Sequence, residues 1–149
     1  MIKLTTTLLL ISSVVGYSQT KQEVKEFIND LGIEKPLIVT AQCYYESGHL
    51  KSNVYKKNNN LFGMKFAHNR LTLAIGKDEN NHAIYRNWKE SVIDYMIWQN
   101  KYYKGGDYYE FIKQSGYCPY NENYIETLKN IKVWTVSIKN RFNVFYTVL

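Results

Sequence analysis

The order of apolar and polar residues predicts two helices in the first third of the chain. Between residues 22 and 31, apolar side chains recur every three or four positions, and Gly32 follows where a left-handed residue can end a helix. A second helix is predicted to begin at Pro36, which the first helical turn tolerates, and to stop at Gly48. Glu46 is therefore expected in the last turn of a mostly apolar helix.

Two capping patterns predict further helices in the second half of the chain. Asn87 with Glu90 precedes a wide apolar face that continues to about residue 103. Asp107 with Glu110 repeats the pattern ahead of a short helix that Gly116 would end, and residues 117–121 are expected to form a turn. A last helix, from about residue 121, places three apolar side chains on one face: Tyr124, Leu128 and Ile131.

The segment between these groups of helices has the composition of loops and a small hairpin. Residues 54–65 contain three successive asparagines and then an apolar run, which predicts a loop or short turn with buried anchors. Residues 70–75 and 82–86 are short strand-like runs, separated by the polar residues 76–81. The whole pattern predicts one α+β domain that is mostly helical and carries a small β-hairpin lobe.

The composition indicates a folded chain of about one domain, with 149 residues of which 45% are hydrophobic and 21% charged. The formal net charge of +6 comes from dispersed lysines and includes no block of like charges of the kind that binds nucleic acid. This charge favours an anionic partner such as the bacterial envelope, whose glycan strands carry acidic peptides, and lysines that only keep the protein soluble are an equal alternative. We expect a monomer that binds no nucleic acid.

Residues 1–18 have the composition of a secretory signal peptide. A positive charge at Lys3 precedes an apolar stretch at residues 8–15, and Gly16-Tyr17-Ser18 offers small residues at the two positions that a signal peptidase reads. The stretch is far shorter than the ~20 residues that span a bilayer. We therefore expect residues 19–149 to be exported as a single domain, to the periplasm or beyond, without stable membrane insertion.

Glu46 is the first candidate for chemistry. Loss of hydration on an apolar helix and the negative end of the helix dipole both disfavour its anion and raise its pKa. A carboxyl group that stays protonated near neutral pH can protonate a glycosidic oxygen, whereas a solvated glutamate at a helix end is the alternative interpretation. The histidines have no metal-ligand spacing, so neither a metal nor a cofactor is implied: His49, His68 and His82.

Several segments carry a resemblance to a known family. Residues 42–52 read QCYYESGHLKS around Glu46, and residues 59–65 read NNLFGMK. Residues 85–91 read YRNWKES, and a tyrosine motif follows at residues 116–128. Together these segments resemble the bacterial endo-β-N-acetylglucosaminidases of glycoside hydrolase family 73, over about residues 24–131.

The resemblance implies a lysozyme-like fold with a substrate groove between a helical body and the β-hairpin lobe. It implies hydrolysis of β-1,4 bonds in peptidoglycan glycan strands, with Glu46 as general acid and Tyr124 near the sugar at the cleavage point. Substrate contacts would come from the loop and from one further tyrosine: Asn60, Leu61, Phe62, Gly63 and Tyr117. For Leu61 and Phe62, plain core packing is an equal alternative.

The second catalytic group is where the chain departs from the family. Many members carry an acidic residue on the hairpin, whereas here only Asp78 and Glu79 occur, in the turn. An inverting enzyme needs such a carboxylate about 6.5–9.5 Å from the acid, and a solvated turn acid is the alternative. Without it, the N-acetyl group of the substrate can attack the anomeric carbon, as in substrate-assisted glycosidases. Tyr124 would then hold that group or stabilise the developing positive charge.

The two cysteines, Cys43 and Cys118, are expected in an oxidising compartment. Cys43 precedes Glu46 on a similar helical face, and Cys118 adjoins the turn after Tyr117 that the fold is expected to bring toward the groove. A disulfide between them would brace the active site, while a buried thiol is the alternative for each.

The sequence leaves two other functions open. A lytic transglycosylase also uses a lone glutamate followed by serine at a helix end, but the loop at residues 60–63 argues against it. A non-catalytic wall-binding module would keep the groove without activity, and the intact Glu46 argues against that. The tail at residues 132–149 keeps apolar character but matches nothing in the family.

Overall fold

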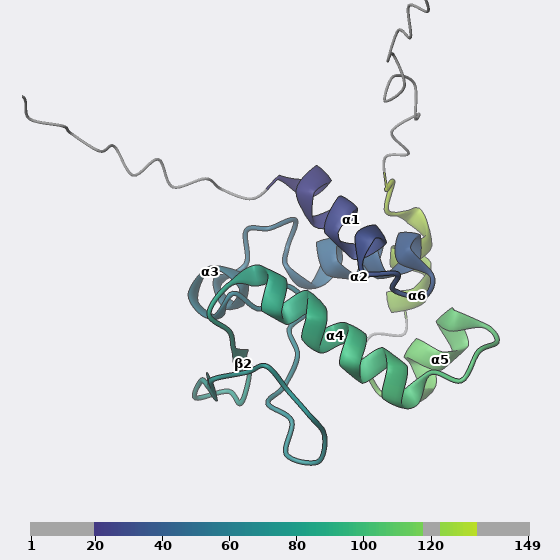
Figure 1. The fold of residues 1–149 in the computed structure, drawn as a ribbon. Helices are drawn as coiled ribbons and strands as arrows, with labels where there is room; N and C mark the ends of the chain where they lie inside the picture. Colours follow the sequence, from purple (N-terminus) through teal and green to yellow (C-terminus); the bar gives the residue numbers. More distant parts are fainter. Residues whose placement is uncertain (1–19, 118–122, 134–149) are drawn as a thin grey trace, which may run out of the picture.

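The computed structural model of the protein describes residues 20–117 and 123–133. Figure 1 shows α1, α2 and α6 on one side of the long helix α4, and the β lobe with its loops on the other. The elements are α1 (Lys21–Asp30), α2 (Pro36–Glu46), α3 (Asn53–Asn58), β1 (Gly76–Lys77), β2 (Ala83–Ile84), α4 (Trp88–Tyr102), α5 (Tyr108–Gln114) and α6 (Tyr124–Asn130). This architecture confirms the predicted α+β class, mostly helical with a small hairpin. Within the described residues, no helix is long and apolar enough to cross a bilayer.

The first two helices begin and end close to the predicted residues. Thr20 caps α1 in a reciprocal capping box with Glu23. Pro36 occupies the first turn of α2, which ends at Glu46. Gly48, with a φ of +55°, then turns the chain away in a conformation that glycine adopts without strain. These signals fix the point at which α2 stops, and hence the position of the Glu46 side chain.

The predicted caps of α4 and α5 are also confirmed. The Asn87 side chain accepts a hydrogen bond from the backbone N–H of Glu90 at 3.2 Å, and Asp107 accepts from two backbone N–H groups in the first turn of α5. The Glu90 carboxylate bonds to the backbone N–H of Arg86 rather than to that of the cap residue. Of the turn predicted at residues 117–121, all but Tyr117 lies outside the described residues.

The prediction of a loop at residues 54–65 is wrong for its first half, where the chain forms α3. The Ser52 side chain caps this helix by accepting a hydrogen bond from the Tyr55 N–H at 3.2 Å. Tyr55 is buried and anchors the helix to the core. Asn59 ends the helix in a left-handed conformation, which asparagine tolerates better than most residues. The asparagine run therefore marks the end of a capped helix.

The hairpin is shorter than predicted and displaced along the chain. β1 and β2 are antiparallel, with Gly76 opposite Ile84 and Lys77 opposite Ala83. An isolated bridge between Lys65 and His82 extends the pairing toward the loop after α3. The second predicted run thus contains β2, but the first, residues 70–75, contains no strand, and β1 lies in the segment predicted as the turn.

Asp94, a fully buried residue of α4, gives the physical reason. Its carboxylate accepts two hydrogen bonds from the Arg70 guanidinium, at 2.8 and 2.9 Å, and one from the backbone N–H of Leu73 at 3.1 Å. The hydroxyl of Tyr85 donates to it at 2.8 Å. A backbone donor engaged in this way cannot join a β ladder. Asp94 therefore fastens residues 66–75, which we call the strap, to α4.

Helix α2 is the centre of the core. Its residues 39–44 are all buried, so every face of this stretch is covered. α1 and α6 pack directly on it. The hydroxyl of Tyr95 in α4 donates to Gln42 at 2.6 Å and lies 2.8 Å from the hydroxyl of Tyr108 in α5. These buried hydrogen bonds hold α2, α4 and α5 in one relative position.

Asp94→Asn is expected to lower the free energy of unfolding by about 3–5 kcal/mol, because the Arg70 guanidinium stays buried without its counter-charge. Urea unfolding followed by circular dichroism measures the loss. Glu90→Gln is the matched control: its partner Arg86 is exposed, so the expected loss is below about 1 kcal/mol. Equal losses in the two variants would contradict the anchoring role of Asp94.

Candidate active site

Glu46 is the last residue of α2, and the backbone leaves the helix directly after it. The N–H of Gly48 bonds to the carbonyl of Tyr45 at 3.0 Å, and the N–H of His49 bonds to the carbonyl of Tyr44 at 2.7 Å. These bonds satisfy carbonyl groups that a helix end leaves unpaired. The Glu46 side chain is partly buried, as the apolar pattern of the helix predicts.

Two segments far apart in the sequence meet the Glu46 carboxyl group. The hydroxyl of Tyr124, in the first turn of α6, donates to Oε1 at 2.5 Å. On the other side lies Gly63, where an added Cβ would come within 3.5 Å of Oε2. Gly63 has a φ of +62°, which residues with side chains rarely adopt. Glycine lets the loop turn beside the carboxyl group and leaves the space in front of Oε2 open.

Burial raises the pKa of Glu46 to about 7, and the hydrogen bond from Tyr124 opposes this shift because it stabilises the anion. The carboxyl group is therefore mostly protonated below pH 7 and loses its proton as the pH rises through that value. Because Tyr124 occupies Oε1, the oxygen that remains for a ligand is Oε2, on the Gly63 side.

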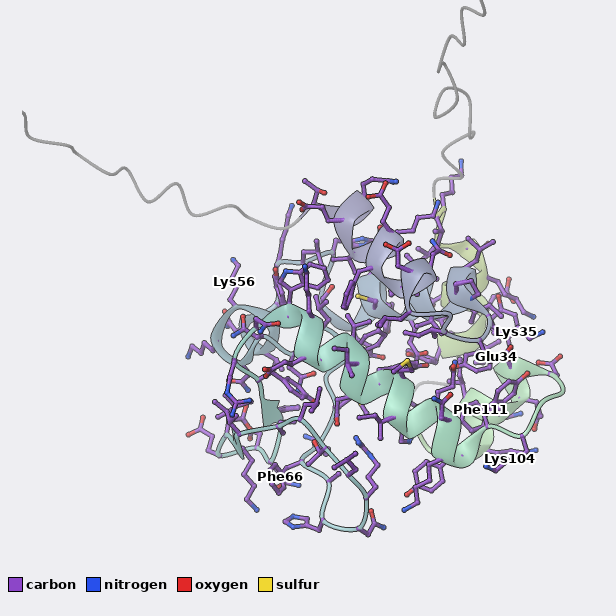
Figure 2. The ribbon with its side chains drawn as sticks, in the orientation of Figure 1. Glu34, Lys35, Lys56, Phe66, Lys104 and Phe111 are labelled. Atoms are coloured by element: carbon purple, nitrogen blue, oxygen red, sulfur yellow. The ribbon has the colours of Figure 1, made fainter. Side chains whose placement is uncertain are left out.

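A groove of about 660 Å³ opens beside Glu46. One wall comes from the loop after α3 and the strap, and the other from α4, α5 and the residues that follow α5. Figure 2 shows Phe111 on the α4–α5 side of the molecule and Phe66 on the side of the β lobe. The described lining residues are Glu46, Phe62, Gly63, Met64, Lys65, Ala67, Asn69, Arg70, Trp98, Tyr102, Phe111, Gln114, Ser115, Gly116 and Tyr117. Glu46 is the only carboxylic acid among them.

Comparison with known proteins identifies the family to which this site belongs. Residues 21–133 match the sequence model of the glucosaminidase family, described as mannosyl-glycoprotein endo-β-N-acetylglucosaminidase. The chain belongs to the glucosaminidase family. Membership confirms the predicted class of enzyme, a glycoside hydrolase of the endo-β-N-acetylglucosaminidase type.

Solved structures include one similar protein, the catalytic domain of the autolysin Auto from Listeria monocytogenes. It shares 20% sequence identity with this glucosaminidase at a TM-score of 0.45, over 73% of this chain and 76% of that chain. Among curated proteins, no match is found.

Of the loop residues predicted to contact substrate, Asn60 and Leu61 are buried away from the groove, whereas Phe62 and Gly63 line it. Asn60 is fully buried, donates to the carbonyls of Met64 and Ala83, and accepts from the Met64 N–H. Leu61 is fully buried in the core and does not line the groove. Phe62 lines the wall, but its ring stacks on Tyr95 with 4.1 Å between ring centroids. Asn60 thus holds the loop in shape, and core packing is the main role of Leu61 and Phe62.

Tyr117 links the loop to the α4–α5 wall. Its hydroxyl donates to the backbone carbonyl of Phe62, and its ring lies 5.6 Å from that of Trp98, edge to face. Tyr117 lines the groove, as does Gly63, so the structure brings these two predicted residues together with Glu46. Tyr124 meets Glu46 from the side of α6.

The two candidate second carboxylates do not join this site. Asp78 accepts hydrogen bonds from Asn58 and from the backbone N–H groups of Asn80 and His82, which organise the hairpin turn. Neither Asp78 nor Glu79 is among the residues that line the groove. Among the described residues, no group of histidine, cysteine and acidic side chains could hold a metal ion.

The predicted disulfide stays a prediction. Cys43 is fully buried in α2 and its thiol is free in the structure, whereas Cys118 lies outside the described residues. Burial raises the pKa of the Cys43 thiol far above its ordinary value, so the thiol is unreactive in this state.

Sequence reasoning missed most of the two groove walls. Trp98 and Tyr102 lie four residues apart in α4, and this spacing on one helical face could have identified them. Lys65 directly follows Gly63-Met64 in the motif at residues 59–65, so its position beside the loop could also have been predicted. Arg70 lies in the strap, and no local pattern points to its contact with Asp94.

Tyr124→Phe is expected to raise the pKa of Glu46 further above its ordinary value, because the hydrogen bond that stabilises the anion is lost. Nuclear magnetic resonance titration of the Glu46 carboxyl carbon measures the change. Tyr103→Phe removes a hydroxyl that, within the described residues, bonds to the Gly106 carbonyl, and should leave the titration unchanged. A lower pKa in Tyr124→Phe would contradict the assigned hydrogen bond.

Proposed function

We propose that this glucosaminidase cleaves β-1,4 bonds within peptidoglycan glycan strands, and that Glu46 is the general acid of the reaction. The observation that carries the proposal is a carboxyl group with a pKa raised by burial to about 7 at an open groove. General acids are most effective when their pKa lies near the working pH. Below about pH 7, Oε2 can protonate the glycosidic oxygen. As the pH rises above 7, this form disappears and the rate falls.

The groove suits a chain of sugar rings. Trp98 and Tyr102 of α4 and Phe111 of α5 line one wall, and aromatic faces are apolar surfaces on which sugar rings stack. Asn69 and Gln114 contribute polar groups for sugar hydroxyls. The groove is open to solvent, and cleavage within a strand requires the strand to lie along it.

For the second part of the reaction, we infer that the substrate's own N-acetyl group replaces a second carboxylate. Support comes from the absence of any carboxylate other than Glu46 among the described groove residues. The N-acetyl carbonyl oxygen attacks the anomeric carbon while Glu46 protonates the leaving oxygen. Water then opens the cyclic intermediate and gives its proton to the Glu46 carboxylate. This route retains the anomeric configuration, so an inverted product would exclude it.

Tyr124 is the residue best placed to assist this step. Its hydroxyl contacts Glu46 at 2.5 Å, so it lies at the point where the acid meets the sugar. There it would hold the N-acetyl group or stabilise the positive charge that develops on the sugar. A Tyr124→Phe enzyme with unchanged turnover would remove this role and leave that of Glu46 intact.

Purified peptidoglycan treated with the parent enzyme is expected to release glycans with reducing N-acetylglucosamine ends, identified by mass spectrometry. Glu46→Gln should reduce the rate by about 10²–10⁴-fold, because loss of a general acid has effects of this size. Glu79→Gln is the matched control, since this exposed hairpin acid lies outside the groove, and it should keep the parent rate.

The product ends also separate the alternative functions. Anhydro-muramic ends would place the enzyme among the lytic transglycosylases. Strand binding without release by the parent would indicate a wall-binding module. A large loss in Glu79→Gln would restore the hairpin carboxylate to the mechanism.

We further propose that the protein is exported through the signal peptide at residues 1–18. The first helix begins with its cap at Thr20, one residue after the expected mature start at Gln19, so cleavage there would leave the capping box intact. Expression of the full sequence in a bacterium should yield an exported protein whose N-terminal peptide, identified by mass spectrometry, starts at Gln19. Retention of the intact chain in the cytoplasm would contradict export.

A further inference from the structure

Lys65 places a positive charge in the groove. It follows the loop of Gly63 and lines the same groove as Glu46. Its ammonium group bonds to two acceptors on the hairpin, the backbone carbonyl of Asn80 at 2.9 Å and Nε2 of His82 at 3.0 Å. In the described part of the chain, no carboxylate lies within ion-pair distance of Lys65.

Asp78 holds this arrangement from the far side of the histidine ring. Its carboxylate lies 3.2 Å from Nδ1 of His82 and accepts from the His82 backbone N–H at 2.8 Å. When Nδ1 carries the ring hydrogen and donates it to Asp78, Nε2 presents its lone pair to Lys65. The hairpin therefore fixes the position of the Lys65 ammonium group. The Asp78 carboxylate is hydrogen-bonded to Asn58, Asn80 and His82.

The other charged groups of the groove do not neutralise Lys65. Arg70 pairs with the buried Asp94 at 2.8 Å, so these two residues together carry no net charge. Glu46 is uncharged in the protonated form that acts as the acid. Among the described residues of the groove, Lys65 is thus the one cation without an ion-pair partner. A fixed ammonium group in such a position gives a strong, charge-assisted hydrogen bond to a carboxylate.

We propose that Lys65 binds a carboxylate of the glycan strand and makes this glucosaminidase prefer anionic strands to neutral polymers of N-acetylglucosamine. The inference rests on the proposed function. Peptidoglycan offers two sources of carboxylate: the stem peptide where it is attached, and the lactyl group of muramic acid where the peptide has been removed. A neutral N-acetylglucosamine oligomer has neither source.

Binding of three soluble ligands distinguishes these possibilities. They are a peptide-bearing glycan fragment, the same fragment without peptides, and an N-acetylglucosamine oligomer of equal length. Calorimetry at pH 6 uses the mature chain with Glu46→Gln, so that no ligand is cleaved. Addition of Lys65→Met should weaken binding of a carboxylate ligand roughly fivefold to tenfold and leave the neutral oligomer unchanged. Loss on the peptide-bearing fragment alone assigns the stem carboxylates, and loss on the peptide-free fragment assigns the lactyl group.

Two further variants separate recognition of charge from support of the hairpin. Lys77→Met makes the same change in charge at an exposed position of β1 outside the groove, and should alter the affinity for no ligand. Lys65→Arg keeps the charge and should keep most of the preference. A rise in salt concentration should weaken the carboxylate ligands with Lys65 present, and much less with Lys65→Met.

An equal loss for all three ligands in Lys65→Met would overturn the proposal, because a lysine that only supports the hairpin acts on every ligand alike. An unchanged set of affinities would overturn it as well. Failure of the proposed function has a different signature, since the parent enzyme would then release no reducing ends from peptidoglycan whatever the affinities of the Lys65 variants.

Discussion

Desolvation of the Glu46 carboxyl group is the constraint on which the rest of the structure depends. Burial raises its pKa to about 7, whereas an unfolded chain gives a glutamate its ordinary value. Folding therefore favours the protonated form. The contribution of Glu46 to the free energy of unfolding is fully present below the pKa that this group has in the unfolded chain. It is lost as the pH rises through about 7. Above that pH, the ionised group lowers the stability of the fold by roughly 3 kcal/mol, from the size of the shift.

The packing around α2 opposes this local loss of stability and also fixes the acid in place. Residues 39–44 are buried on all sides, and Tyr95 joins Gln42 of this helix to Tyr108 of α5. The end of α2 cannot shift without disturbing these contacts. The hydroxyl that bonds to the Glu46 carboxyl group and the glycine beside it come from elements placed by the same core, since α6 packs on α2 and the loop of Gly63 is shaped by the buried Asn60. The pKa of Glu46 is therefore a property of the whole fold.

Helix caps and helix ends could be predicted from the sequence, because each depends on residues close together in the chain. The caps at Asn87 and Asp107 and the end of α2 beside Gly48 could be identified because each depends on a few neighbouring residues. The strand predicted at residues 70–75 of the strap is wrong, because the conformation there is set by Asp94, more than twenty positions along the chain. The contact between Tyr124 and Glu46 was accessible only through the family resemblance, since the two residues lie 78 positions apart. Periodicity carries no information about contacts at that separation.

The acidic residues of the hairpin were predicted from the sequence as candidates for the site, but their contacts in the structure are different. Asp78 was a candidate second carboxylate, but in the structure it holds His82, and His82 in turn meets Lys65. The groups that shift the pKa of Glu46 are its burial and Tyr124. A second carboxylate near Glu46 would raise the pKa of Glu46 further, because two close negative charges disfavour ionisation. On the proposed function, the β lobe selects the strand through Lys65, and Glu46 supplies the proton.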